Sequence, residues 1–297
     1  MRATFAIPAP LEPGDVVAVV APSGPFRADD LWRGLAWLRS RYRIRIDPGA
    51  LDRDGFLAGS DARRRAELDR ARREPEAKAV VAVRGGYGAM RIADDLPWAE
   101  LAMRPRWIVG FSDITALHAM AWRAGVAAVH GPNVTGLGPQ SPSVRAAWLA
   151  ALERPTASRV WRDLRVLQGG RARGPLVGGN LSILHAMAAA GRLALPAGAI
   201  LALEDVTEAP YRVDRMLTSL LVGEHLSRLS AIVFGGFDRC YAGPDGRTVD
   251  HVLEERTRSL GIPVLAGAPF GHAPHNEAFV LGLPALVGDD AVTLAAS

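Results

Sequence analysis

The sequence has one cysteine and one lysine among its 297 residues, and aromatic residues make up only 6% of it. A single cysteine, Cys240, excludes an intrachain disulfide, and neither a CxxC nor an HExxH pattern is present to bind zinc. We therefore expect no metal and no other cofactor. A reducing compartment suits such a chain.

Long apolar runs are missing as well. No stretch reaches the roughly 18 to 20 uninterrupted apolar residues that a membrane span needs. The first residues, MRATFAIPAPLEPGD, contain Pro8, Pro10 and Pro13, which interrupt any apolar segment of signal-peptide length. We expect a cytoplasmic protein without a membrane partner.

The net charge of +4 does not indicate nucleic-acid binding, because the arginines are scattered along the chain. The densest cluster, at 63–65, is followed by Glu67, Asp69 and Glu74. This alternation predicts a solvated helix face with i,i+4 ion pairs rather than a basic stripe. With 49% hydrophobic and 22% charged residues, the composition is typical of a globular protein.

The first half alternates apolar runs with amphipathic helical stretches. The predicted strands are DVVAVVAPSG, AVVAVRGGYG, RWIVGFSD and AAVHGPNV, with helices between them. Strands that are apolar on both faces and separated by helices predict a doubly wound parallel α/β sheet. Ligands of such sheets bind at the carboxyl ends of the strands.

The pattern loosens at 136–175, where the polar, glycine-rich QGGRARGP predicts a domain exit and a linker. From Val177 a second set of elements begins, with shorter strands, several glycines and β segments at the end. This half predicts a mixed, more β-rich domain.

The turn VGFSDITALHAM places a serine, Ser112, where a strand gives way to a helix. One interpretation is helix capping, for which Ser and Asp are favoured. The other is that Ser112 is a nucleophile, with the backbone N–H of Asp113 at a helix start stabilising an oxyanion. The motif is not the G-x-S-x-G of α/β-hydrolases, because Ile114 stands where the second glycine would be.

The segment VRGGYGAM follows another strand. Gly85, Gly86 and Gly88 free its backbone, so that N–H groups can turn toward an anion. The alternative is an ordinary tight turn between strand and helix. A dinucleotide fingerprint does not fit the glycine spacing.

A serine nucleophile requires a base and a carboxylate that orients it. LALEDV presents Glu204 and Asp205 at a strand end, and APFGHAPHN presents His272 and His275. His130, at the end of another strand, is the rival of His272. The remaining histidines lie within or beside predicted helices: His118, His185, His225 and His251.

Seven segments, in order, resemble those of the LD-carboxypeptidases, serine peptidases of the muramoyltetrapeptide carboxypeptidase type. The segments are VAVVAPSGP, VRGGYGAMRI, VGFSDITALH, VGGNLSILHA, LEDVTEAPYRVDRML, VFGGF and PFGHAPHNEAFVLG, from about Val16 to about Ala285. The resemblance implies Ser112 as nucleophile, Glu204 as the orienting carboxylate and His272 as the base. His275 is a weaker candidate for the base, and Asp205 and Glu208 rank below Glu204.

The resemblance also implies the architecture: a Rossmann-like (flavodoxin-like) domain, which we place at 1–154, followed at 155–297 by a linker and a β-rich mixed α/β domain. The active site is then expected between the domains, and a homodimer is expected.

The implied reaction is release of the terminal D-Ala of a cytoplasmic murein tetrapeptide, in peptidoglycan recycling, through an acyl-enzyme. The N–H groups of Asp113 and of Gly85 or Gly86 would form the oxyanion hole. Arg84, beside the glycine loop, is a candidate for binding the substrate carboxylate, and a structural role is its alternative.

Two other functions compete with this one. Microcin-immunity enzymes of the same family cleave an aminoacyl-nucleotide amide, but they tend to be longer, with an extra loop. A non-catalytic Rossmann-like binding protein would keep its ligand binding after Ser112→Ala.

Overall fold

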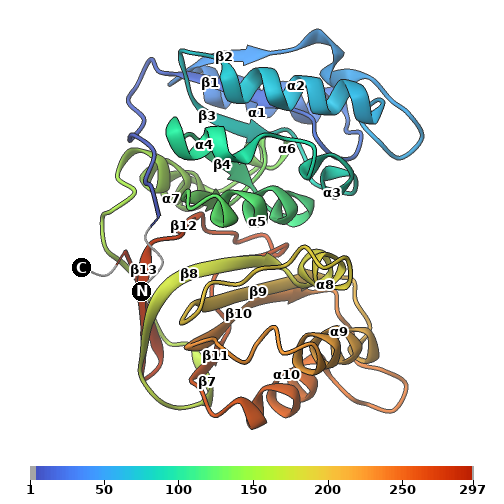
Figure 1. Cartoon of the computed structure of the whole chain (residues 1–297), viewed down its shortest axis with the longest axis vertical. Coiled ribbons are helices and arrows are strands. Elements are labelled where there is room, and N and C mark those ends of the chain that lie inside the picture. The colour runs from blue at the N-terminus through green and yellow to red at the C-terminus, as the bar shows by residue number, and fades with distance from the viewer. Residues whose placement is uncertain (1–4, 296–297) are drawn as a thin grey trace. The chain divides into compact units, whose positions relative to one another are not determined.

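The computed structural model describes residues 5–295, and the chain divides into two compact units (Figure 1). The first unit contains Phe5–Pro155 and Glu277–Val280, and the second contains Thr156–Asn276 and the chain from Leu281 onward. Residues 277–280 thus return to the first unit after the chain has built most of the second. None of the described helices is both long enough and apolar enough to cross a bilayer.

The first unit has a six-stranded sheet in the order β12-β5-β4-β3-β1-β2. Its strands are β1 (Val16–Val20), β2 (Arg43–Ile46), β3 (Ala77–Ala82), β4 (Trp107–Gly110), β5 (Ala128–His130) and β12 (Phe279–Leu281). The pairs from β2 to β5 are all parallel, and the order 2-1-3-4-5 is that of flavodoxin-like folds. The predicted fold class of this half is confirmed.

Helices connect these parallel strands, and every residue of β1 and β4 is buried. This explains why the strands read as continuous apolar runs in the sequence. The connecting helices are α1 (Ala28–Arg39), α2 (Asp61–Arg73), α3 (Ala89–Ala93), α4 (Trp98–Met103) and α5 (Thr115–Arg123), with short 3-10 turns η1 (Pro48–Leu51) and η2 (Ser112–Ile114). Helices α6 (Val134–Leu137) and α7 (Pro142–Glu153) follow β5.

The arginine cluster in α2 is not the fully solvated face that the charge pattern predicts. Arg65 does form a surface ion pair, with Asp95, but Arg64 is completely buried. Its guanidinium donates hydrogen bonds to the carbonyl oxygens of Pro22 and Gly88. The prediction is wrong for Arg64 because a guanidinium with five donors can be buried where backbone carbonyls accept from it.

The second unit has an eight-stranded sheet in the order β6-β14-β13-β8-β9-β10-β11-β7. Its strands are β6 (Arg159–Trp161), β7 (Arg165–Gln168), β8 (Ala172–Asn180), β9 (Ile200–Val206), β10 (Ala231–Asp238), β11 (Val264–Ala266), β13 (Pro284–Gly288) and β14 (Ala291–Leu294). The four strands from β8 to β11 are parallel, and the other pairs are antiparallel. The predicted β-rich mixed α/β class is confirmed.

The described part of this unit has the helices α8 (Leu181–Ala189), α9 (Pro210–Val222) and α10 (Val249–Thr257) and the 3-10 turn η3 (Arg258–Leu260). Helix α9 packs against both α8 and α10. The side chain of Asn180 caps α8 by accepting from the N–H of Ile183.

The predicted linker at 136–175 is wrong in part, because it contains β6, β7 and the start of β8. Strands β6 and β7 follow one another in the chain yet lie at opposite edges of the sheet, so residues 162–164 connect its two ends. The sheet must curl for so short a segment to reach, since four peptide units span at most about 14 Å. Strand β8 is visibly curved (Figure 1).

Candidate active site

Ser112 lies directly beyond the carboxyl end of β4, at the first position of η2. Its φ of 64° is in the left-handed region, which non-glycine residues seldom adopt. Its hydroxyl caps neither η2 nor α5, since neither helix start has a side-chain cap. The serine therefore holds a strained backbone without contributing the capping bond that was the alternative explanation for it.

The glycine loop packs directly against this serine. A Cβ atom added to Gly85 would lie 2.8 Å from the Cβ and 3.1 Å from the Oγ of Ser112. Gly86 has a φ of 105°, and the carbonyl of Gly85 accepts from the N–H of Gly24, in the loop after β1. Three loops at the carboxyl ends of β1, β3 and β4, which are neighbours in the sheet, thus meet at one point.

Asp113 joins the serine turn to the glycine loop. It is 1% exposed, and its Oδ2 accepts from the N–H of Ala89, the first residue of α3, at 2.8 Å. Burial raises the pKa of this carboxyl. Within residues 5–295, no backbone–backbone hydrogen bond outside the helices and strands starts from the N–H groups of Gly85, Gly86 or Asp113.

Arg84 is held by the protein itself. Its Nη1 donates to the carbonyl oxygen of Pro25 at 2.5 Å, and the side chain is exposed. This bond ties the glycine loop to the segment after β1, which favours the structural role over carboxylate binding.

In the second unit, Glu204 and His272 form one hydrogen-bonded pair. His272 Nδ1 lies 2.7 Å from Glu204 Oε2, although 68 residues separate the two in the sequence. Glu204 belongs to β9 and is fully buried, whereas the His272 side chain is 15% exposed. The carboxylate is thus shielded from solvent, and the ring keeps an edge that solvent reaches.

The environment shifts the pKa of both groups. Burial raises the pKa of Glu204, against the opposing effect of the bond to His272. Burial alone would lower the pKa of His272, but the hydrogen bond and the negative charge of Glu204 outweigh it, so the pKa of His272 is raised. A histidine that gains a proton readily and is oriented through Nδ1 has the properties of a general base.

Neighbouring residues fix the position of this pair. Gly271 has a φ of 123°, and a Cβ there would lie 3.1 Å from the Cβ of Glu204. Its N–H donates to Oδ1 of the buried Asn276 at 3.2 Å. The loop that carries His272 is thereby held against β9.

The alternative orienting residues are engaged elsewhere. Asp205 accepts from Asn180 Nδ2 at 3.0 Å and from the backbone N–H and hydroxyl of Ser182 at 2.9 and 2.7 Å. Glu208 lies 3.7 Å from Arg212. Of the three carboxylates, Glu204 is the one in contact with His272.

The rival histidines occupy different surroundings. His130 is completely buried and stacks on Phe279, with ring centroids 4.9 Å apart. His275 is exposed. Burial lowers the pKa of His118 to about 3, so that this histidine is neutral in the folded core.

Sequence reasoning missed the asparagines that support these loops. Asn133 Oδ1 accepts from the N–H of Phe111 at 3.2 Å, next to the serine, and Asn276 does the same for the His272 loop. Both asparagines stand in polar loop segments, GPNV and PHNE, and only their burial in the folded chain sets them apart from an ordinary loop residue. Among residues 5–295, no group of three or more His, Cys, Asp or Glu side chains could hold a metal ion.

Comparison with known proteins extends over both units. The family model described as LD-carboxypeptidase N-terminal domain matches residues 17–131, and that of the C-terminal domain matches residues 173–287. The murein tetrapeptide carboxypeptidase of Pseudomonas aeruginosa is 35% identical over 91% of this chain and 92% of its own. The chain is a serine-type carboxypeptidase. It belongs to the LD-carboxypeptidase family.

Solved structures agree with the fold. The muramoyltetrapeptide carboxypeptidase of Oxalobacter formigenes superimposes with a TM-score of 0.85 at 30% identity, covering 94% of this chain and 97% of that one. An MccF-like protein of Bacillus anthracis gives a TM-score of 0.85 at 22% identity, covering 97% and 99%. At that identity the second likeness shows the fold alone.

Proposed function

We propose that this enzyme releases the terminal D-Ala of murein tetrapeptide, as a step of peptidoglycan recycling, with Ser112 as nucleophile, His272 as general base and Glu204 as its orienting carboxylate. The names of the relatives from P. aeruginosa and O. formigenes support the substrate class. The observation that carries the mechanism is the 2.7 Å bond between His272 Nδ1 and the buried Glu204.

That bond has a chemical consequence. With Nδ1 donating to Glu204, Nε2 of a neutral imidazole is the free acceptor, and this is the atom that takes a proton from a serine hydroxyl. In this proposal the chain's own groups supply both the proton transfer and the charge stabilisation.

The proposed reaction has two halves. Ser112 Oγ attacks the carbonyl carbon of the bond that precedes D-Ala, while His272 takes the hydroxyl proton and then delivers it to the leaving amine of D-Ala. The N–H groups of Asp113 and of Gly85 or Gly86 stabilise the tetrahedral oxyanion. Water, activated by His272, then hydrolyses the ester to regenerate Ser112.

The test measures free D-Ala by mass spectrometry after incubation with L-Ala-γ-D-Glu-diaminopimelate-D-Ala. The wild type should release D-Ala, Ser112→Ala should not, and Ser143→Ala, at an exposed serine of α7, should behave like the wild type. Release by Ser112→Ala at the wild-type rate would refute the role of the serine.

A wild type that releases no D-Ala would refute the substrate assignment. In that case an aminoacyl sulfamoyl adenosine is the next substrate, since it tests the microcin-immunity alternative directly. Ligand binding by Ser112→Ala without turnover by any variant would support the non-catalytic alternative.

A further inference from the structure

A hollow of about 490 Å³ lies at the start of α9 in the second unit. Pro210 and Tyr211 form one wall, Gly243 and Pro244 in the loop after β10 form another, and Val252 of α10 forms a third. The exposed fraction of Tyr211 is 58%. Of these residues Tyr211 and Pro244 are exposed and Pro210 is buried, so an aromatic ring and one proline present apolar surface to solvent.

This hollow is at the same end of the sheet as Glu204. Strand β9 carries Glu204 and ends at Val206, and α9 begins at Pro210, only four residues later. The loop after β10 leaves the neighbouring parallel strand at the same end, and the N–H of Glu208 contacts Cys240 Sγ at 3.3 Å to join the two connections. In open α/β sheets this is the end at which ligands bind.

The charges of the hollow select against an anionic ligand. Its lining has three carboxylates and two guanidinium groups. The guanidinium of Arg256 pairs with Asp214, at 2.7 Å, and with Glu255, which Arg247 also contacts. The lining keeps a formal charge of −1, and its carboxylates have further lone pairs that hydroxyl groups can donate to.

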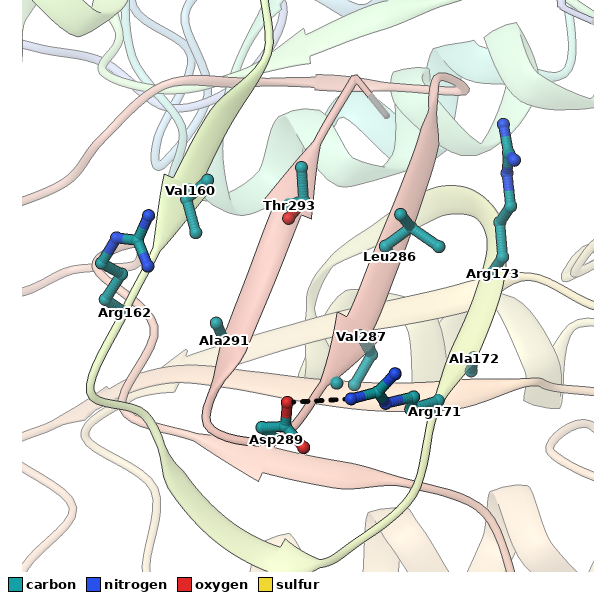
Figure 2. Close-up of a pocket in the computed structure, with 11 residues that line it drawn as sticks. Val160, Arg162, Arg171, Ala172, Arg173, Leu286, Val287, Asp289, Ala291 and Thr293 are labelled. Carbon is teal, nitrogen blue, oxygen red and sulfur yellow. Dashed lines mark hydrogen bonds and ion pairs between the residues drawn. The ribbon is translucent and has the colours of Figure 1, made fainter. Parts of the chain in front are cut away.

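A larger hollow, of about 550 Å³, has the opposite character (Figure 2). Arg162, Arg171 and Arg173 line it, with Asp289 as the one carboxylate. It includes Ala172, the first residue of β8, whereas Asn180, the last, pairs with Glu204. Along the strand that separation is about 26 Å of chain, which places the arginine-lined hollow at the opposite end of β8 from the residue that pairs with Glu204.

We propose that the hollow beside Tyr211 is a subsite for an uncharged sugar ring attached to the substrate peptide. This inference rests on the proposed function. The murein tetrapeptide carries several carboxylates, which the acidic lining repels, whereas a muramoyl group joined to it through an amide is neutral. The apolar face of a sugar ring stacks on tyrosine, and its hydroxyl groups donate to carboxylates such as Asp214 and Glu255.

The test compares the KM of the tetrapeptide with that of its N-acetylmuramoyl derivative. The wild type should bind the derivative about five- to tenfold more tightly, a preference of about 1 kcal/mol. Tyr211→Ala should reduce the ratio to about one, and Tyr211→Trp should retain it. The control is Trp32→Ala, at an exposed aromatic residue of α1 (48% exposed), which should keep the wild-type ratio.

Two outcomes would overturn the subsite: equal KM values of the wild type for both substrates, or a preference that persists in Tyr211→Ala. Hydrolysis of the bare tetrapeptide tests the proposed function separately. If neither substrate is cleaved, saturation-transfer NMR with the methyl ester of N-acetylmuramic acid still tests whether the hollow binds a sugar. Transfer in the wild type and its loss in Tyr211→Ala support the subsite, and equal transfer in both proteins, or none, refutes it.

Discussion

Replacing Gly85 with alanine tests the contact between the glycine loop and the serine turn. The new Cβ would lie 2.8 Å from the Ser112 Cβ and 3.2 Å from the carbonyl oxygen of Phe111. Neither neighbour is the far end of a flexible side chain, so the backbone of one loop must move. Overpacking of this kind destabilises a protein by about 1–3 kcal/mol.

A double-mutant cycle isolates the cause. Ser112→Gly removes the Cβ that the new methyl group meets, and it also relieves a φ of 64°, which costs a non-glycine residue about 1–2 kcal/mol. We therefore expect Ser112→Gly to stabilise the fold. In that background the cost of Gly85→Ala should fall by about 1–2 kcal/mol, and this decrease is the coupling energy between the two positions.

The assay is urea denaturation followed by circular dichroism, with the free energy of unfolding extrapolated to water. Gly169→Ala is the matched control, because a Cβ there has no neighbour within 4 Å. D-Ala release by Gly85→Ala should also fall, by about 100-fold, if the serine moves by about 1 Å. An equal loss of stability from Gly85→Ala in both backgrounds would show that Ser112 is not the group it meets.

Three more predictions concern charged and amide groups. Glu204→Gln removes the charge that raises the pKa of His272, so kcat should fall by about 10²–10⁴-fold. The acidic limb of the pH profile of kcat/KM should also move to lower pH, and a limb that does not move would contradict the pairing of Glu204 with His272. Asn276→Ala leaves the N–H of Gly271 without its acceptor and should lower kcat by about tenfold, whereas Asn276→Asp should retain the wild-type kcat. An effect on KM alone would argue against a role of Asn276 in positioning His272. Burial raises the pKa of Glu67 from 4.5 to about 7, so the folded state binds the proton more tightly than the unfolded state. The free energy of unfolding should therefore decrease by about 3 kcal/mol as the pH rises from 4.5 to about 7, and thermal unfolding of Glu67→Gln should lack this decrease.

Local patterns account for what the sequence predicted well. The apolar strands β1, β3 and β4 are buried on both faces, so each appears as a continuous run whose end marks a loop of the candidate site. Ser112 was found because it stands directly after such a run. The pairing of Glu204 with His272 came from family resemblance, since no spacing rule brings together residues of two strand ends that lie 68 positions apart.

The features that were missed depend on distant parts of the chain. Arg64 belongs to a cluster that looks solvated, and its burial follows from carbonyl groups of two loops that the helix meets only in the folded unit. Strands β6 and β7 are three and four residues long, too short for an alternating pattern to show. Their pairing partners, β14 and β11, lie about a hundred or more residues further along.

The same pairings set an order of events during synthesis. In the described chain, strand β6 pairs with β14, and the first unit gains β12 from residues 279–281. The first sheet therefore stays incomplete until residues 279–281 have been made, and the second until residues 291–294 have been made, however early β1 to β5 come together. Contacts so distant in sequence form late and slowly, so a nascent chain that stops short of β12 leaves two unfinished sheets rather than one finished unit.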